Sequence, residues 1–185
     1  MRHACFALLL LSASMLSTAE PNMVQPKYTG DNQLIRPTGY REWIFVGSSL
    51  GMGYQEATQA ATDKPPQFHN VYVQPEAYRA YVATGKFPDK TMMVMEVISS
   101  GSNASINKKG RFEENFIGIE MAVKDESKVP EKWAYYNFIT SDGKGRTEAK
   151  PFAKDSCWSC HNQHAEADNV FVQFYPVLRE ARPKP

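Results

Sequence analysis

Two cysteines and a histidine near the C-terminus have the types and the spacing needed to hold a covalent cofactor. The chain contains one such run, Cys157-Trp158-Ser159-Cys160-His161. Two thiols separated by two residues can add to the vinyl groups of a haem, and an imidazole directly after the second thiol can ligate the iron. We therefore interpret Cys157 and Cys160 as the attachment residues of one haem c and His161 as its proximal iron ligand.

Three other interpretations use the same residues. Zinc could be held by Cys157, Cys160, His161 and His164, but the adjacent Cys160 and His161 can hardly both reach one tetrahedral ion, and a second ligand pair at normal spacing is missing. A thioredoxin-like redox pair would need a strand, a helix and a strand around the motif. A structural disulfide is the simplest alternative. The haem interpretation is favoured over all three.

The first residues have the pattern of a secretory signal peptide. A short basic start precedes an apolar run from Ala4 to Leu11, and Ala19 ends a group of small residues suited to cleavage. The apolar run is too short to cross a bilayer, so we expect no membrane span. The sequence thus predicts a signal peptide at 1–19, an extended N-terminal arm at 20–37, one haem domain at 38–185 and a periplasmic location.

Charge and length restrict the function further. The net charge is +1, and the densest basic run is Lys108-Lys109-Gly110-Arg111. Nucleic-acid binding normally needs a strongly basic surface, so we expect no nucleic-acid partner. The length that remains after signal-peptide cleavage suits one domain with one substantial core.

The residues before the motif predict a sheet. Strands are expected at 68–73, 91–99, 116–123 and 133–140, and residues 43–47 either end a short helix or form another strand. Pro75 and Gly85 mark the start and the end of a helix. In the strand at 91–99, alternation places Met93, Met95 and Val97 on one face and Met92, Val94 and Glu96 on the other.

The C-terminal segment is expected to be helical around the attachment site. Phe171, Phe174, Tyr175 and Leu178 recur at helical spacing, and Pro176 must either begin a new helix or kink the existing one. Together the elements predict an α+β fold, with a mainly antiparallel β-sheet, flanking helices and a C-terminal segment for c-type haem attachment.

A strand-rich chain with a C-terminal CxxCH resembles the cytochrome P-460 family and its cross-link-free relatives, the cytochromes c-prime-beta. The resemblance covers about Tyr40 to Arg179 and rests on four blocks besides the motif. These are Tyr40-Arg41-Glu42-Trp43, Val71-Tyr72-Val73-Gln74-Pro75-Glu76-Ala77-Tyr78, Gly85-Lys86-Phe87-Pro88-Asp89, and Asn169-Val170-Phe171-Val172-Gln173-Phe174-Tyr175-Pro176-Val177-Leu178.

The resemblance implies a homodimer in which a sheet forms the wall above the distal haem face and His161 lies below. Cross-linked family members oxidise hydroxylamine and bind nitric oxide, using a lysine joined to the porphyrin. Alignment from Phe87-Pro88-Asp89 places Met95 at that lysine, and a thioether cannot form the same bond. His69 stands where those members have a distal arginine. The distal acid is not assigned, because Glu120 and Glu148 both match only loosely.

Three functions follow. The iron could be five-coordinate beside Met95 and His69 and bind a small diatomic or nitrogen-oxide ligand such as nitric oxide. Alternatively, Met95 or His69 could fill the sixth position of an electron-transfer cytochrome. The third function, hydroxylamine or peroxide oxidoreduction, is disfavoured by the missing lysine. Methionine in a strand most often fills space, so we expect Met95 to line the pocket. The sequence identifies no redox partner protein.

Overall fold

The computed structural model describes residues 23–53 and 65–183 of the chain. Its main element is a five-stranded antiparallel sheet in the order β2-β3-β4-β5-β6. The strands are β2 (Ile44–Leu50), β3 (Phe68–Val73), β4 (Met92–Gly101), β5 (Phe112–Lys124) and β6 (Trp133–Asn137). A second, two-stranded sheet pairs β1 (Leu34–Ile35) with β7 (Glu148–Ala149). The expected α+β fold with a mainly antiparallel sheet is confirmed.

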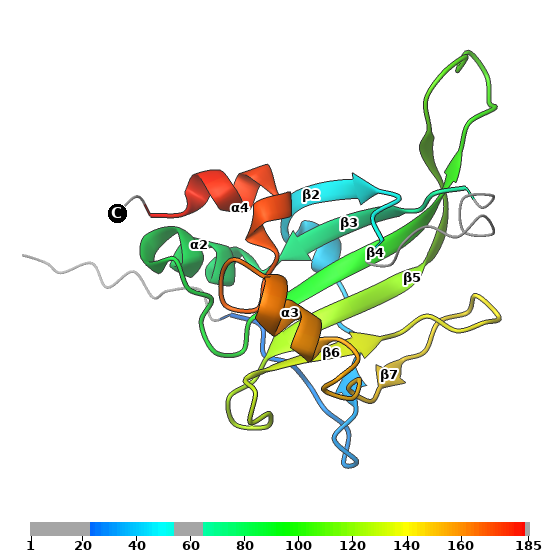
Figure 1. Ribbon diagram of the computed structural model, residues 1–185. Coiled ribbons are helices and arrows are strands. Elements are labelled where there is room, and N and C mark those ends of the chain that lie inside the picture. Colours follow the sequence, from blue (N-terminus) through cyan, green and yellow to red (C-terminus); the bar gives the residue numbers. More distant parts are fainter. Residues whose placement is uncertain (1–22, 54–64, 184–185) are drawn as a thin grey trace, which may run out of the picture.

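In the described ranges, three α-helices accompany the sheet: α2 (Pro75–Thr84), α3 (Trp158–His164) and α4 (Pro176–Ala181). Figure 1 shows them gathered around one end of the sheet, with α3 in front of β5 and β6. The start and end of α2 follow the sequence prediction, because Pro75 occupies the first turn, where no N–H is needed. Gly85 ends the helix with φ 73° and donates its N–H to the Tyr81 carbonyl at 2.7 Å.

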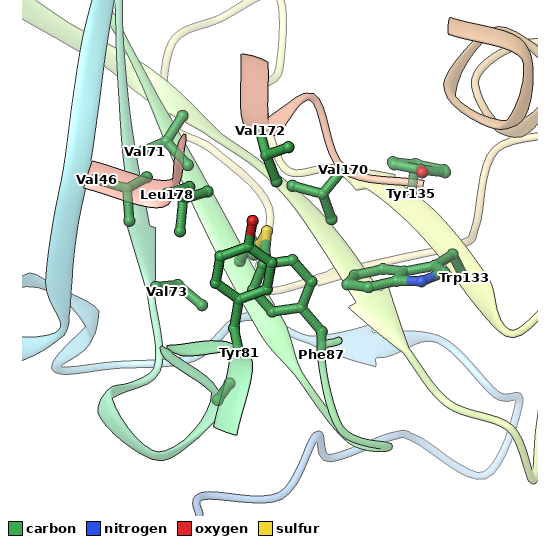
Figure 2. Packing of buried hydrophobic residues seen from close by; sticks show 12 residues of the cluster. Val46, Val71, Val73, Tyr81, Phe87, Trp133, Tyr135, Val170, Val172 and Leu178 are labelled. Carbon is green, nitrogen blue, oxygen red and sulfur yellow. The ribbon is translucent and has the colours of Figure 1, made fainter. Parts of the chain in front are cut away.

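The two faces of the sheet have separate cores. One core contains residues of α2, α4 and the segment after α3, and at its centre the rings of Tyr81 and Phe87 stack with centroids 4.5 Å apart (Figure 2). The other core packs the N-terminal arm and β7 on the sheet through Leu34 and Ala149. The central strand β4 is buried on both faces. Its sequence, rich in methionine and valine, is therefore mostly apolar on both sides.

The alternation predicted for β4 is present. Met93, Met95 and Val97 face the core that contains the C-terminal segment, and Met92 and Val94 face the other. Glu96, on that second face, is 3% exposed and accepts hydrogen bonds from the Tyr40 hydroxyl at 2.7 Å and the Arg41 Nε at 2.6 Å. A buried carboxylate needs such partners, so this network belongs to the stability of the fold.

Two predicted elements differ in length from the sequence prediction. The strand expected at 133–140 ends at Asn137. The hairpin of β4 and β5 extends further than expected, through pairs such as Gly101 with Phe112. In the aromatic C-terminal segment, Pro176 begins a new helix, α4, which is one of the two alternatives expected from the sequence, and a 3₁₀ turn at Val172–Phe174 precedes it. None of the helices in the described ranges is long and apolar enough to cross a membrane. The predicted signal peptide at 1–19 lies outside the described residues.

Candidate functional site

Helix α3 presents the attachment motif to the sheet. Cys157 caps its N-terminus, so Cys157, Cys160 and His161 stand at positions i, i+3 and i+4 and share one helical face. Cys157 packs against the core that contains Tyr81 and Phe87. The ring centroid of His161 lies 4.2 Å from that of Tyr135 on β6. The three residues singled out in the sequence therefore point toward the same side of the sheet. His164 is exposed on the following turn.

The imidazole of His161 is held in one orientation. Its Nδ1 lies 2.9 Å from the Asn169 carbonyl oxygen, which can only accept, so Nδ1 carries the proton. Its ring also contacts Phe171, with centroids 4.4 Å apart. Burial lowers the pKa of His161, against the opposing effect of the hydrogen bond to Asn169. The result is a neutral imidazole with Nε2 as the free donor atom, the state that a metal ligand requires.

The donor set fits a c-type haem. Cys157 and Cys160 are both free, so no disulfide joins them, and both thiols remain for thioether formation. Within the described ranges, no three His, Cys, Asp or Glu side chains gather so that they could hold a metal ion, which leaves the zinc interpretation without a ligand set. When bound, the haem would supply the redox chemistry of its iron. Cys157, Cys160 and His161 would hold it.

Strand register brings Met95 together with an acidic residue. Met95 on β4 pairs with Val71 on β3 and with Glu120 on β5. Directly paired residues point to the same face, and Met95 packs in the same cluster as Cys157. Met95 and Glu120 therefore lie side by side on the face of the sheet that α3 covers.

His69 lies on the same face, further along the sheet. It pairs with Val97, two residues beyond Met95, so His69 and Met95 are diagonal neighbours at roughly 7–8 Å between their backbones. The expectation that their strands are adjacent is confirmed. Burial lowers the pKa of His69, so its imidazole is neutral near pH 7.

Of the two loosely matched acids, Glu120 lies beside the motif and Glu148 does not. Burial raises the pKa of Glu120, and the pKa of Cys157 is raised first by burial and then by the charge of Glu120. These two groups thus share one poorly solvated environment. Glu148 is exposed on β7, where its carboxylate accepts a hydrogen bond from Gln33 at 3.4 Å.

Sequence reasoning did not assign Tyr135, Asn169 or Glu120 to the site. Asn169 contributes a backbone carbonyl, which no side-chain pattern can reveal. One signal was nevertheless present, since consecutive Asp168 and Asn169 are residue types that tolerate left-handed backbone, and both adopt it, at φ 47° and 59°. Glu120 could have been found by aligning the alternation of β5 with that of β4.

The fold and the site together define a class of protein, a haem protein with an attachment helix packed on an antiparallel sheet. Residues 37–172 match the family model described as cytochrome P460, which is more than half of the chain. The chain therefore belongs to the cytochrome P460 family, and haem is the cofactor that this family implies. A comparison with curated proteins finds no match.

The raised pKa of Glu120 predicts how a conservative variant behaves. A carboxyl group whose folded-state pKa is raised contributes stability below its unfolded pKa of about 4.3, and this contribution is lost as the pH rises through the folded-state value. Gln cannot ionise, so Glu120→Gln should unfold at higher denaturant than the unchanged protein at pH 7. The gain is about 1.4 kcal/mol for each unit by which the pKa is raised.

Guanidinium unfolding of the haem-loaded protein from pH 4 to 8 measures this difference. Glu114→Gln is the matched control, because Glu114 is an exposed carboxylate on the same strand. The control should follow the pH dependence of the unchanged protein. Parallel curves for Glu120→Gln and the unchanged protein would contradict the burial of an ionisable group at this place.

Proposed function

We propose that this protein is an exported monohaem c-type cytochrome that binds nitric oxide or a related small nitrogen oxide at its haem iron, with redox activity. The observation that carries the proposal is that Met95 and Glu120 lie side by side on the sheet face that α3 covers. Cys157, Cys160 and His161 would hold the haem from α3, and the sheet would contribute the apolar side chain of Met95 and the carboxyl group of Glu120. These two side chains would offer a small ligand apolar contact and one hydrogen-bonding group.

The carboxyl group of Glu120 adds a specific capability to that face. Because burial raises its pKa, Glu120 keeps a proton to a higher pH than an exposed carboxyl group does. A protonated carboxyl group can donate a hydrogen bond to a ligand oxygen or nitrogen. We infer that Glu120 supports a polar diatomic in this pocket.

The test is spectroscopic. Ferric and ferrous spectra of the purified holoprotein should show high-spin, five-coordinate iron, and stopped-flow mixing with nitric oxide should show direct binding. An electron-transfer cytochrome is the second candidate, favoured by the placement of Met95 on the pocket face, since methionine is a familiar axial ligand. Low-spin iron in both oxidation states, with no nitric oxide binding, would overturn the proposal in favour of that candidate.

We propose that the protein acts in the periplasm as a homodimer, after cleavage near Ala19. The export proposal rests on the N-terminal sequence pattern. A contact surface is offered on the sheet face away from α3, where Phe45 and Phe116 are each 48% exposed and the guanidinium of Arg41 lies 5.4 Å from the ring centroid of Phe116. Phenylalanine and arginine are enriched in protein interfaces relative to the rest of the surface.

A further inference from the structure

The carbonyl oxygen of Asn169 accepts two hydrogen bonds from different elements. The first donor is the Nδ1–H of His161 on α3, at 2.9 Å, and the second is the hydroxyl of Tyr135 on β6, at 3.1 Å. A carbonyl oxygen has two lone pairs and can serve both. Each donor withdraws electron density from the oxygen, so the two hydrogen bonds are coupled.

The carbonyl cannot turn to favour one donor, because the segment around it is fixed. Asp168, next to Asn169, accepts hydrogen bonds at 2.8 Å from the Nζ of Lys124 and at 3.3 Å from the Nε1 of Trp133. The Asp168 Oδ2 that accepts from Lys124 also accepts a hydrogen bond from the backbone N–H of Phe87 at 3.3 Å. These three contacts come from β5, β6 and the loop after α2, and they hold the left-handed Asp168-Asn169 pair against the sheet.

The ring of Tyr135 also contacts the ring of His161. The two ring centroids are 4.2 Å apart, and the hydroxyl oxygen of Tyr135 reaches the same carbonyl as the imidazole. Figure 2 shows Tyr135 at the edge of the core, apart from the central stack of Tyr81 and Phe87. Tyr135 is 8% exposed, so water does not compete for its hydrogen bond.

We propose that Tyr135 is a positioning residue that sets the electron-donor strength of His161 by sharing the Asn169 carbonyl. This inference rests on the proposed ligation of haem iron by His161. When the carbonyl serves Tyr135 as well, it is a weaker acceptor for the Nδ1–H, so the imidazole carries less negative charge. A less electron-rich axial ligand stabilises ferric iron less, and the reduction potential is higher.

The test replaces the hydroxyl and leaves the ring. In Tyr135→Phe, the Asn169 carbonyl serves His161 alone, so the reduction potential should fall and the iron–histidine stretching frequency in resonance Raman spectra should rise. The net free energy of one hydrogen bond corresponds to a change of about two- to tenfold in an equilibrium constant. We expect the equilibrium constant for reduction to fall by no more than this, and a tenfold fall is about 59 mV for a one-electron couple. Tyr136→Phe is the matched control, since Tyr136 is the adjacent buried tyrosine on the opposite face.

A second variant changes the sign of the effect. Incorporation of 3-fluorotyrosine at position 135 makes the hydroxyl a stronger donor, so the potential should rise above that of the unchanged protein. A residue that only filled space would not give opposite shifts in these two variants. Shifts of equal sign, or no shift in holoprotein whose iron is ligated by His161, would overturn the inference. Absence of histidine-ligated haem from the unchanged protein would instead overturn the proposed function.

Discussion

Changing both cysteines of the motif to alanine should abolish covalent haem attachment completely. Cys157 and Cys160 are free and face the sheet from one side of α3, so each thiol is available to one vinyl group. After expression with a periplasmic haem-ligation system, the unchanged protein should keep one haem through acid extraction and give a c-type pyridine haemochrome. The double variant should release all of its haem into the organic phase.

Ser159→Ala is the control for this experiment. Ser159 stands between the two cysteines, and its hydroxyl donates to the Lys154 carbonyl at 3.4 Å, outside the shared face of the motif. Its variant should retain covalent haem in full. Unchanged protein that folds without haem and takes up one zinc ion per chain would contradict the assignment of Cys157 and Cys160 as haem-attachment residues. Zinc would then be the group that the motif binds.

Local patterns predicted those parts of the fold in which short-range and long-range preferences agree. The strand at Phe68–Val73 and the helix from Pro75 to its cap at Gly85 have the same limits in the structure as in the sequence prediction. The helix has Pro75 in its first turn and Gly85 at its C-terminal end, where the backbone needs these residue types. The two faces of β4 were predictable from strand alternation, and each face packs in its own core.

The extension of the β4 and β5 hairpin was not predictable from periodicity. Ser100 pairs with Glu113 and Gly101 with Phe112, and apart from Phe112 these residues carry no apolar pattern. Their pairing follows from continuation of the ladder beyond the core and not from burial. Hydrophobic alternation reports only the part of a strand that is packed.

The site was predictable to the extent that it consists of side chains in a motif. Cys157, Cys160 and His161 form a motif of five residues that is visible in the sequence. In contrast, Asn169 acts through its backbone carbonyl. Glu120 is placed by the strand pairing that sets it beside Met95. Register is set by strand pairing, which here joins two residues more than twenty positions apart in sequence, Met95 and Glu120. Such a relation depends on the whole sheet, so a single residue pattern cannot supply it.

The position of Met95 beside Glu120, on the face that α3 covers, makes Met95 the residue to test. We propose that Met95 stands where cross-linked relatives have the lysine that joins the porphyrin, and a thioether has no amine to form that bond. We therefore expect the ferrous spectrum of an ordinary c-type haem, without the red-shifted band of the cross-linked proteins. Hydroxylamine oxidation should be slow or absent. A red-shifted ferrous band in the unchanged protein would contradict this expectation.

Met95→Lys and Met95→Ala test the position from two sides. Lysine restores the amine on the face that carries Cys157, so partial cross-linking on exposure to oxidant is expected. Alanine distinguishes the two candidate functions: an open site should keep its spin state and bind nitric oxide at least as fast, whereas a methionine-ligated site should become high-spin and fall in potential. Optical spectra and stopped-flow kinetics measure both results.

The matched control is Met92→Ala, on the same strand but in the opposite core. Met92 is 2% exposed and packs with Val94 and Met121, so its truncation should cost about 2–5 kcal/mol of stability and leave the haem spectrum unchanged. This contrast separates loss of packing from loss of a group at the iron. If neither change at Met95 alters the spectrum or the ligand kinetics, Met95 does not face the haem. In that case Glu120, its partner in the register, does not face the haem either, and the proposed pocket would have to lie elsewhere on the sheet.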